Sequence, residues 1–121
     1  MENIIPAIDR ALIKKELKRK LFRITNHGNR EIYIVDNLNA PNILLEIGRL
    51  REISFRDSGG GTGKSVDLDE FDLSENPFQQ LIVWDPKEEE IIGGYRFMKY
   101  SDCSSLKGKA IISPRRGFPN Q

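Results

Sequence analysis

Apolar residues recur at near-helical spacing early in the chain. A proline at position 6 suits the first turn of a helix. The apolar positions that follow it are Ile8, Leu12, Leu17 and Leu21. This spacing predicts an amphipathic helix from Pro6 to Phe22, with a basic outer face.

A second helix is predicted from Pro41 to about Arg56, because proline again stands where a first turn would begin. Its apolar face is formed by Ile43, Leu44, Ile47, Leu50 and Ile53. Its polar face is expected to carry Glu46, Arg49, Arg51, Glu52 and Arg56.

Runs of β-branched and aromatic residues predict three strands, which are Glu31 to Val35, Gln80 to Trp84 and Glu90 to Tyr100. A turn at 85–88 joins the last two into a β-hairpin. The Gly93-Gly94 pair in its second arm suggests a bulge or a close backbone approach. The pattern therefore predicts an α+β fold, with a short, mostly antiparallel sheet and two helices. Beyond it, residues 101–121 are expected to form a weakly structured basic tail with one short apolar run, Ala110 to Ile112.

The loop from Asp57 to Lys64 has four glycines in five positions and ends like a phosphate-binding P-loop. A P-loop needs a preceding strand and an earlier glycine, whereas a predicted helix precedes this loop and Ser58 stands at that position. An acidic segment follows and would repel a nucleotide. A mobile or tightly turning loop is therefore favoured over a nucleotide site.

Composition narrows the classes further. The 121 residues fit one domain, and 19 basic against 18 acidic residues leave no overall field to attract nucleic acid. The single cysteine, Cys103, excludes a disulfide framework or a cysteine-rich metal site, and we expect no metal. His27 has no catalytic partner within reach in the sequence. Neither a signal peptide nor a membrane span is visible, so the cytoplasm is expected.

The near-zero net charge hides two charged segments. Residues 10–23 contain seven basic residues and one acid, and residues 67–75 contain five acids and no base. The basic segment from Lys14 to Arg23 could contact the anionic inner surface of a membrane, or it could be the solvated face of a packed helix; both interpretations stay open.

The acidic segment holds three aspartates, Asp67, Asp69 and Asp72, on a short turn. Leu68 and Phe71 alternate with them and are expected to point inward. Carboxylates in such a cluster can be solvated, can pair with arginines, or can bind a cation or an ammonium group.

Arg96 is expected in the middle of a strand, where a charge is costly unless it is paired or exposed. Arg96 together with Asp69 or Asp72 is therefore the candidate functional group of residues.

Five segments in order resemble a known family. They are Glu46-Ile47-Gly48-Arg49-Leu50-Arg51-Glu52 followed by Phe55-Arg56, then Gly59 to Lys64, Asp67-x-Asp69-x-Phe71-Asp72, Gln80 to Asp85, and Gly93-Gly94-Tyr95-Arg96. This order resembles the hemolysin-like N-acyltransferases of the GNAT superfamily, which include enzymes that make ornithine and glycine lipids. The acyl-homoserine-lactone synthases are more distant relatives. Each motif alone is weak, but five in order are specific.

The resemblance implies transfer of a long, often 3-hydroxylated acyl chain from acyl carrier protein, or from acyl-CoA, to an amino-acid amine, with no bound cofactor. By this resemblance Asp69, Asp72 and Arg96 would be catalytic. Asp69 and Asp72 would position the amine or accept its proton through water, while Arg51, Phe55 and Asp67 would shape the acceptor site. Acyl carrier protein and the amino acid are the implied partners, and no nucleic acid is expected.

In this superfamily, further strands and a donor-binding helix follow the strand that carries the equivalent of Arg96. Residues 1–100 are therefore expected to form the N-terminal half of a partial GNAT-like domain that is inactive alone. A non-enzymatic membrane-binding or partner-binding module is the alternative. The last strand would leave an open sheet edge, which another copy of the chain, a swapped element or the Ala110 to Ile112 run could complete.

Overall fold

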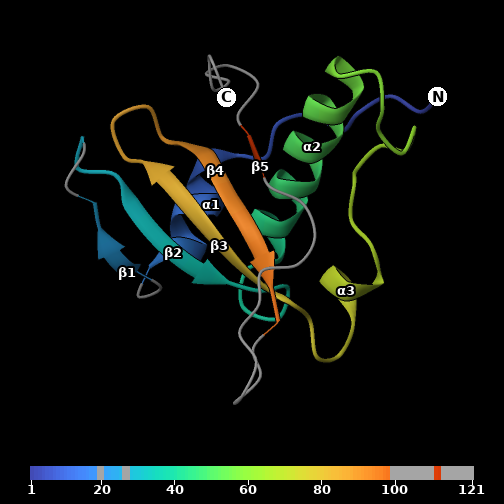
Figure 1. Cartoon of the computed structure of the whole chain (residues 1–121). Helices are drawn as coiled ribbons and strands as arrows, with labels where there is room; N and C mark the ends of the chain where they lie inside the picture. Colours follow the sequence, from blue (N-terminus) through green and yellow to red (C-terminus); the bar gives the residue numbers. More distant parts are fainter. Residues whose placement is uncertain (19–20, 26–27, 99–110, 113–121) are drawn as a thin grey trace.

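The computed structural model describes residues 1–18, 21–25, 28–98 and 111–112. Helices and strands follow one another along these residues as shown in Figure 1. Their order and bounds are α1 (Arg10–Leu17), β1 (Leu21–Ile24), β2 (Glu31–Val35), α2 (Pro41–Asp57), α3 (Glu70–Leu73), β3 (Gln79–Asp85), β4 (Glu90–Phe97) and β5 (Ile111–Ile112).

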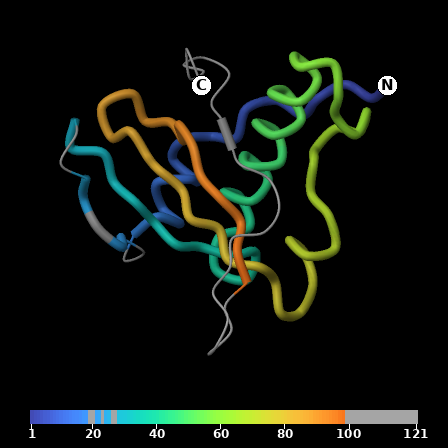
Figure 2. The backbone as a smooth tube through the Cα atoms, in the orientation of Figure 1, coloured from blue at the N-terminus to red at the C-terminus, as the bar shows by residue number. Residues whose placement is uncertain are grey.

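The described strands form one antiparallel sheet in the order β1-β2-β3-β4-β5. The longer helices α1 and α2 lie against one face of this sheet, and the chain can be followed between them in Figure 2. The connection from β2 to β3 contains α2 and α3, and it places α3 beside the end of the sheet where β3 begins. The predicted α+β class with an antiparallel sheet is confirmed.

The hydrophobic core fills the space between the sheet and the two longer helices. Its buried side chains are Ile13, Leu17, Tyr33, Val35, Ala40, Ile43, Leu44, Ile47, Leu50, Ile82, Trp84 and Ile91. α2 forms where the apolar spacing predicts it, although Ile53 on that face is only half-buried. Burial of these apolar side chains is the main favourable term in folding.

The first helix is much shorter than the predicted range of 6–22. Asp9 caps its N-terminus, because the Asp9 carboxylate accepts a hydrogen bond of 2.9 Å from the amide of Ala11. At the other end the chain leaves the helix and pairs Leu21 with Tyr33 of β2. The buried residues of α1 are therefore Ile13 and Leu17, and Leu12 of the predicted stripe is largely exposed.

Three charged residues that the pattern places on the outside of α2 are buried. Glu46, Arg51 and Glu52 are 8%, 1% and 0% exposed. These residues are buried because two other segments of the chain cover this side of α2. The backbone amide of Ile8 donates to the Glu46 carboxylate, and the amide of Asp67 donates to the Gly48 carbonyl. The N-terminal segment and the segment before α3 therefore cover the side of α2 that a simple amphipathic pattern leaves to solvent.

The predicted β3–β4 hairpin forms, and its glycine pair has the predicted effect. Val83 pairs with Gly93 but Trp84 pairs with Ile91, so one extra residue of β4 is accommodated as a bulge. A Cβ on Gly94 would lie 2.3 Å from the carbonyl oxygen of Leu81, so the neighbouring strand leaves no room for a side chain there.

The outer edge of β4 is paired over two residues. Gly93 lies opposite Ile112 and Gly94 opposite Ile111, so β5 coincides with the apolar run that the sequence offered as one completion of the edge. Assembly of copies through this edge stays a prediction. His27 and Cys103 lie outside the described residues, as does nearly all of the tail from 101 to 121.

The close contact at Gly94 predicts a large effect of one methyl group. We expect Gly94→Ala to lower the free energy of unfolding by about 1–3 kcal/mol, because the added Cβ must push β3 and β4 apart. Gly60→Ala is the matched control, since its Cβ would meet the Phe55 carbonyl at an ordinary 3.5 Å. Urea unfolding followed by circular dichroism measures both. Equal midpoints for the two variants would contradict the packing described here.

Candidate functional site

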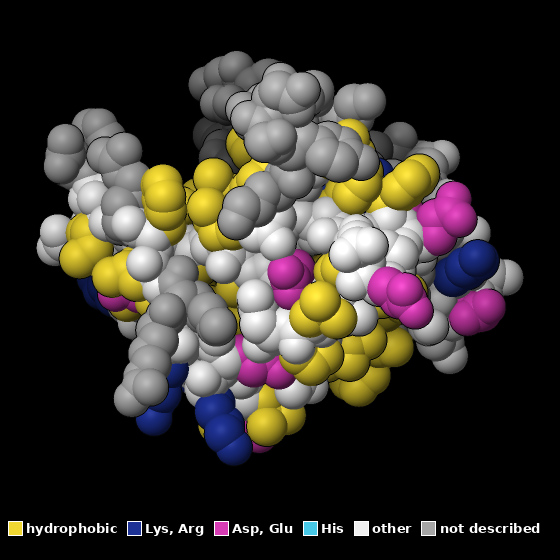
Figure 3. Space-filling model, turned by 90° about the horizontal axis from the view of Figure 1, so that it is seen from below, with side chains coloured by type: hydrophobic (Ala, Val, Ile, Leu, Met, Phe, Trp, Pro, Cys, Tyr) yellow, Lys and Arg dark blue, Asp and Glu magenta, His cyan; other side chains and the backbone are white. Residues whose placement is uncertain are grey.

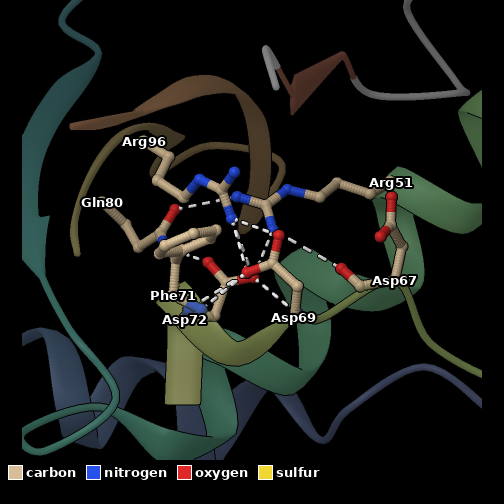
Figure 4. A network of polar contacts seen from close by, with 7 residues as sticks. All are labelled: Arg51, Asp67, Asp69, Phe71, Asp72, Gln80 and Arg96. Atoms are coloured by element: carbon tan, nitrogen blue, oxygen red, sulfur yellow. Dashed lines mark hydrogen bonds and ion pairs between the residues drawn. The ribbon is translucent and has the colours of Figure 1, made fainter. Parts of the chain in front are cut away.

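Polar side chains from four elements meet between α2, α3 and the sheet (Figure 4). Arg51 comes from α2, Asp69 and Asp72 from the start of α3, Gln80 from β3 and Arg96 from β4. We call these five residues the arginine–carboxylate network. It joins segments that are up to 45 residues apart in the sequence, from Arg51 to Arg96.

The Asp-x-x-Asp spacing positions the carboxylates by capping α3. The Asp69 side chain accepts from the backbone amides of Phe71 and Asp72 at 3.0 and 3.2 Å. In return, Asp72 Oδ2 accepts from the amide of Asp69 at 3.0 Å. This reciprocal capping box fixes the direction of both carboxylates by contacts that do not involve the arginines.

Arg51 and Asp72 form the buried centre of the network. Arg51 donates from Nη1 to Asp72 Oδ2 at 3.0 Å and from Nη2 to Gln80 Oε1 at 3.1 Å. The amide nitrogen of Gln80 donates to the other oxygen of Asp72 at 2.8 Å. The Arg51 and Asp72 side chains are 1% and 0% exposed, so each charge has its partner away from water.

Arg96 extends the network toward the surface. Its Nη1 lies 2.7 Å from both carboxylate oxygens of Asp69 and 3.4 Å from Asp72 Oδ2. The prediction that Arg96 pairs with Asp69 or Asp72 is confirmed, because it contacts both. The rings of Phe71 and Phe78 lie 5.7 and 5.3 Å from its guanidinium carbon, within cation–π distance.

Phe71 does not point into the core as expected. Its side chain is 47% exposed and contacts Phe78 and Arg96, whereas Leu68 packs against the core as predicted. The Asp69 side chain is 37% exposed, so the network reaches solvent beside this aromatic pair. Seen from below, the surface of the molecule carries both apolar and acidic side chains (Figure 3).

The electrostatics of Asp69 favour holding a cation over accepting a proton. Burial raises the pKa of Asp69, but the hydrogen bond and charge of Arg96 outweigh it and lower that pKa to about 2. Burial likewise opposes the charge on Arg96, and the two aspartates more than compensate and raise its pKa. At neutral pH Asp69 is therefore a charged but weakly basic carboxylate.

Two donors of the network have no acceptor among the residues that the structure describes. The Nε atoms of Arg51 and Arg96 are buried, and within residues 1–18, 21–25, 28–98 and 111–112 neither has a hydrogen-bond partner. A buried donor without a partner costs about 1–3 kcal/mol, so such groups in a cluster of charges suggest that a ligand completes it. Carboxylate and carbonyl oxygens are the natural acceptors for guanidinium N–H groups.

The other two predicted site residues lie beside the network. Asp67 is buried, and its backbone carbonyl lies 3.4 Å from Arg51 Nη1. Phe55 is half-buried one turn beyond Arg51 on α2, and its carbonyl accepts from the amides of Ser58 and Gly60. Sequence reasoning missed Gln80. The available signal was the alternation along β3, which places the polar Gln80 on the same inward face of the strand as Ile82 and Trp84.

A second buried carboxylate organises the glycine-rich loop. Glu52 accepts from the Thr62 amide at 2.9 Å, the Thr62 hydroxyl at 2.7 Å, the Gly63 amide at 2.9 Å and Arg56 Nε at 2.5 Å. The loop amides that would hold a phosphate in a P-loop therefore surround a carboxylate of the chain itself. A Cβ on Gly61, which has φ of 95°, would lie 2.9 Å from Glu52 Oε2. The sequence favoured a mobile or tightly turning loop rather than a nucleotide site, and these hydrogen bonds to Glu52 show a tightly turning loop.

Glu52 is strongly stabilised in its ionised form. Burial raises the pKa of Glu52, but the hydrogen bonds from Thr62, Arg56 and Gly63 outweigh burial and lower that pKa to about 2. The N-terminal segment also binds this loop. The Glu2 amide donates to the Gly63 carbonyl at 2.8 Å, and the Ile5 amide donates to the Ser65 carbonyl at 3.2 Å.

Comparison with known proteins places this geometry in context. The acetyltransferase (GNAT) domain family matches residues 50–114, just over half of the chain. The chain is 53% identical over 103 residues to a glycine N(alpha)-acyltransferase of Bacteroides thetaiotaomicron, with 84% of this chain and 31% of that protein covered. It is 52% identical over 120 residues to a glycine N(alpha)-acyltransferase of Phocaeicola vulgatus, with 98% and 37% covered.

The chain thus spans about a third of the length of these curated relatives. No solved structure matches it. Within the described residues, no helix is long and apolar enough to cross a membrane, and no three metal-binding side chains gather into a group.

The buried pair at the centre of the network predicts a stability defect. We expect Asp72→Asn to lower the free energy of unfolding by about 3–5 kcal/mol, because it leaves the Arg51 charge buried without its carboxylate. Glu75→Gln, an exposed change a few residues away, is the control and should change stability by less than about 0.5 kcal/mol. Chemical denaturation measures both. An Asp72→Asn variant as stable as the Glu75→Gln control would contradict the buried ion pair described here.

The Glu52 carboxylate predicts a loss of stability in acid. Its pKa is lower in the folded chain than the ordinary 4.5, so its stabilisation is present above about pH 4.5 and is lost as the pH falls toward 2. The span corresponds to roughly 3 kcal/mol. We expect the difference in unfolding free energy between the native chain and Glu52→Gln to shrink over this range. A difference that is constant from pH 7 to pH 2.5 would contradict the assignment.

Proposed function

The chain belongs to the GNAT acetyltransferase-domain family, and from this premise we propose that it forms the acceptor-binding part of an enzyme that acylates the amino group of glycine. The observation that carries the proposal is the arginine–carboxylate network, which reaches the surface at Asp69 and holds two buried guanidinium Nε donors that have no acceptor in the described part of the chain. The names of the two relatives support glycine as the acceptor.

An amino acid in solution carries one positive and one negative group, and the network offers a partner for each. Asp69 is ionised and accessible, so it suits the ammonium group of the acceptor. The Nε–H groups of Arg51 and Arg96 suit its carboxylate, which would satisfy both orphan donors. Glycine has no side chain to place, so recognition of its two charged ends is sufficient.

In the proposed reaction the ammonium group of glycine first gives one proton to water, and the free amine nitrogen then attacks the carbonyl carbon of an acyl thioester. The new C–N bond forms, the C–S bond breaks, and the sulfur leaves as a thiolate that takes up a proton. The nitrogen gives up a second proton and keeps one hydrogen as the amide N–H. A carboxylate with a pKa of about 2 is a poor acceptor for those protons, so we assign Asp69 to positioning the amine, with water as the first proton acceptor. Asp72 would act through Arg51 and Arg96 as a positioning residue.

The finer parts of the proposal concern the donor and the pathway. We propose a fatty acyl thioester as donor, carried by acyl carrier protein or by coenzyme A, and a product that is an acylated amino-acid lipid of the glycine or ornithine class. The order of motifs from Glu46 to Arg96 supports this assignment. Contact of the basic segment from Lys14 to Arg23 with an anionic membrane would fit such a product and belongs to the same proposal.

Glycine binding tests the acceptor site directly. We expect glycine at millimolar concentrations to shift the side-chain ¹⁵Nε–¹Hε resonances of Arg51 and Arg96, assigned with Arg51→Lys and Arg96→Lys, because lysine keeps the charge but lacks this donor. Glycine ethyl ester has no carboxylate and is the matched control. Glycine that shifts neither resonance, or an ester that shifts them equally, would contradict the proposal.

The same samples test acyl transfer by mass spectrometry. Acyl carrier protein and coenzyme A thioesters are supplied in separate reactions, which distinguishes the two donors. We expect no N-acylglycine from this chain alone, because it spans only about a third of the length of its relatives. N-acylglycine that forms with the native chain and is lost in Arg96→Lys would overturn that expectation and assign the reaction to the network.

A further inference from the structure

A cavity among the described residues lies away from the arginine–carboxylate network. It has a volume of about 650 Å³ and opens between the segment before α1, the middle of α2 and the turn end of the β3–β4 hairpin. Its walls are mainly apolar and include Ile8, Ile13, Leu50, Ile53, Trp84 and Ile91. A cavity of this size lies in the range of small-molecule and cofactor sites.

Two carboxylates of the cavity wall, Glu46 and Glu89, are paired within the protein, and the exposed Asp9 and Arg10 also line the cavity. Glu46, which is buried in its wall, accepts two hydrogen bonds from Arg49 at 2.8 and 2.6 Å and one from the Ile8 amide at 3.2 Å. Glu89 pairs with Lys14 of α1 at 2.6 Å. A polar ligand would find these groups already occupied and would leave its own groups unpaired against aliphatic walls.

We propose that this cavity binds the hydrocarbon tail of the acyl group that the donor carries. The inference rests on the proposed function, because acyl transfer supplies the one ligand that is both long and apolar. Consecutive residues of α2 link the two sites: Leu50 lines the cavity, and Arg51 belongs to the network. Adjacent positions of α2, which point about 100° apart around the helix axis, therefore belong to the site for the tail and the site for the acceptor.

Trp84 makes the proposal measurable, because it is the only tryptophan of the chain and lies in the cavity wall with 3% exposure. We expect 12-bromododecanoic acid to quench its fluorescence saturably, since bromine quenches on contact, and dodecanoic acid to compete for the same site. Each methylene that leaves water should strengthen binding about fourfold. The C8, C10 and C12 acids should therefore differ by about fifteenfold per step until the cavity is filled.

A matched pair of substitutions locates the bound tail. Ala7 lies at the cavity wall, and Ala11 lies outside it on α1; both are exposed, so phenylalanine should not disturb the core at either position. We expect Ala7→Phe to weaken binding of the C12 acid at least tenfold and Ala11→Phe to change it less than twofold. Thermal unfolding checks that both variants remain folded.

The outcomes separate this proposal from the proposed function. A smaller hollow of about 410 Å³, lined in part by Lys18 and Tyr33, also touches Trp84 on the other side of α1. Quenching that Ala7→Phe leaves unchanged would place the tail in that hollow and overturn the inference, as would the absence of saturable quenching. Neither result bears on glycine binding at Arg51 and Arg96, which is measured without any acyl chain.

Discussion

The buried ion pair between Arg51 and Asp72 is the constraint on which the rest of this structure depends. Each partner is almost fully withdrawn from water, so neither tolerates the loss of the other. Gln80 bridges the two groups and anchors them to β3, and Arg96 ties the same carboxylate to β4. The pair thereby fixes how α2 and α3 sit relative to the hairpin, and it places the half-buried carboxylate of Asp69 beside the buried guanidinium of Arg96.

α2 organises the molecule on both of its sides. One side contributes the aliphatic core against the sheet, as in any amphipathic helix. Its flanks carry charged residues that are buried because other segments of the chain cover them. Glu52 accepts hydrogen bonds from the glycine-rich loop, Glu46 accepts one from the N-terminal segment, and Arg51 donates to Asp72 in α3. Polar contacts thus attach these irregular segments to the helix.

The sequence was sufficient for those parts of the fold that local spacing determines. β2, α2 and the β3–β4 hairpin with its bulge follow from periodicity and glycine placement. The four residues of β1 were missed because Leu21 continues a helical spacing, and pairing with β2 decides their structure. Within the candidate site, the pairing of Arg96 with a carboxylate was predictable, because a charge in the middle of a strand needs a partner. The burial of Arg51 and Glu52 was not predictable, because it depends on partners 10 to 29 residues away. No local pattern of polar positions contains that information.

The capping box of α3 has a consequence for the substitutions that this chain can accept. At an ordinary helix start, Asp, Asn and Ser replace one another readily, because each offers an oxygen to the backbone amides. Here the oxygens that cap α3 also neutralise Arg96 and Arg51. An exchange that preserves the helix therefore still leaves a guanidinium unbalanced. Asp69 and Asp72 therefore need a carboxylate that balances an arginine of another element, and not only an oxygen that caps α3.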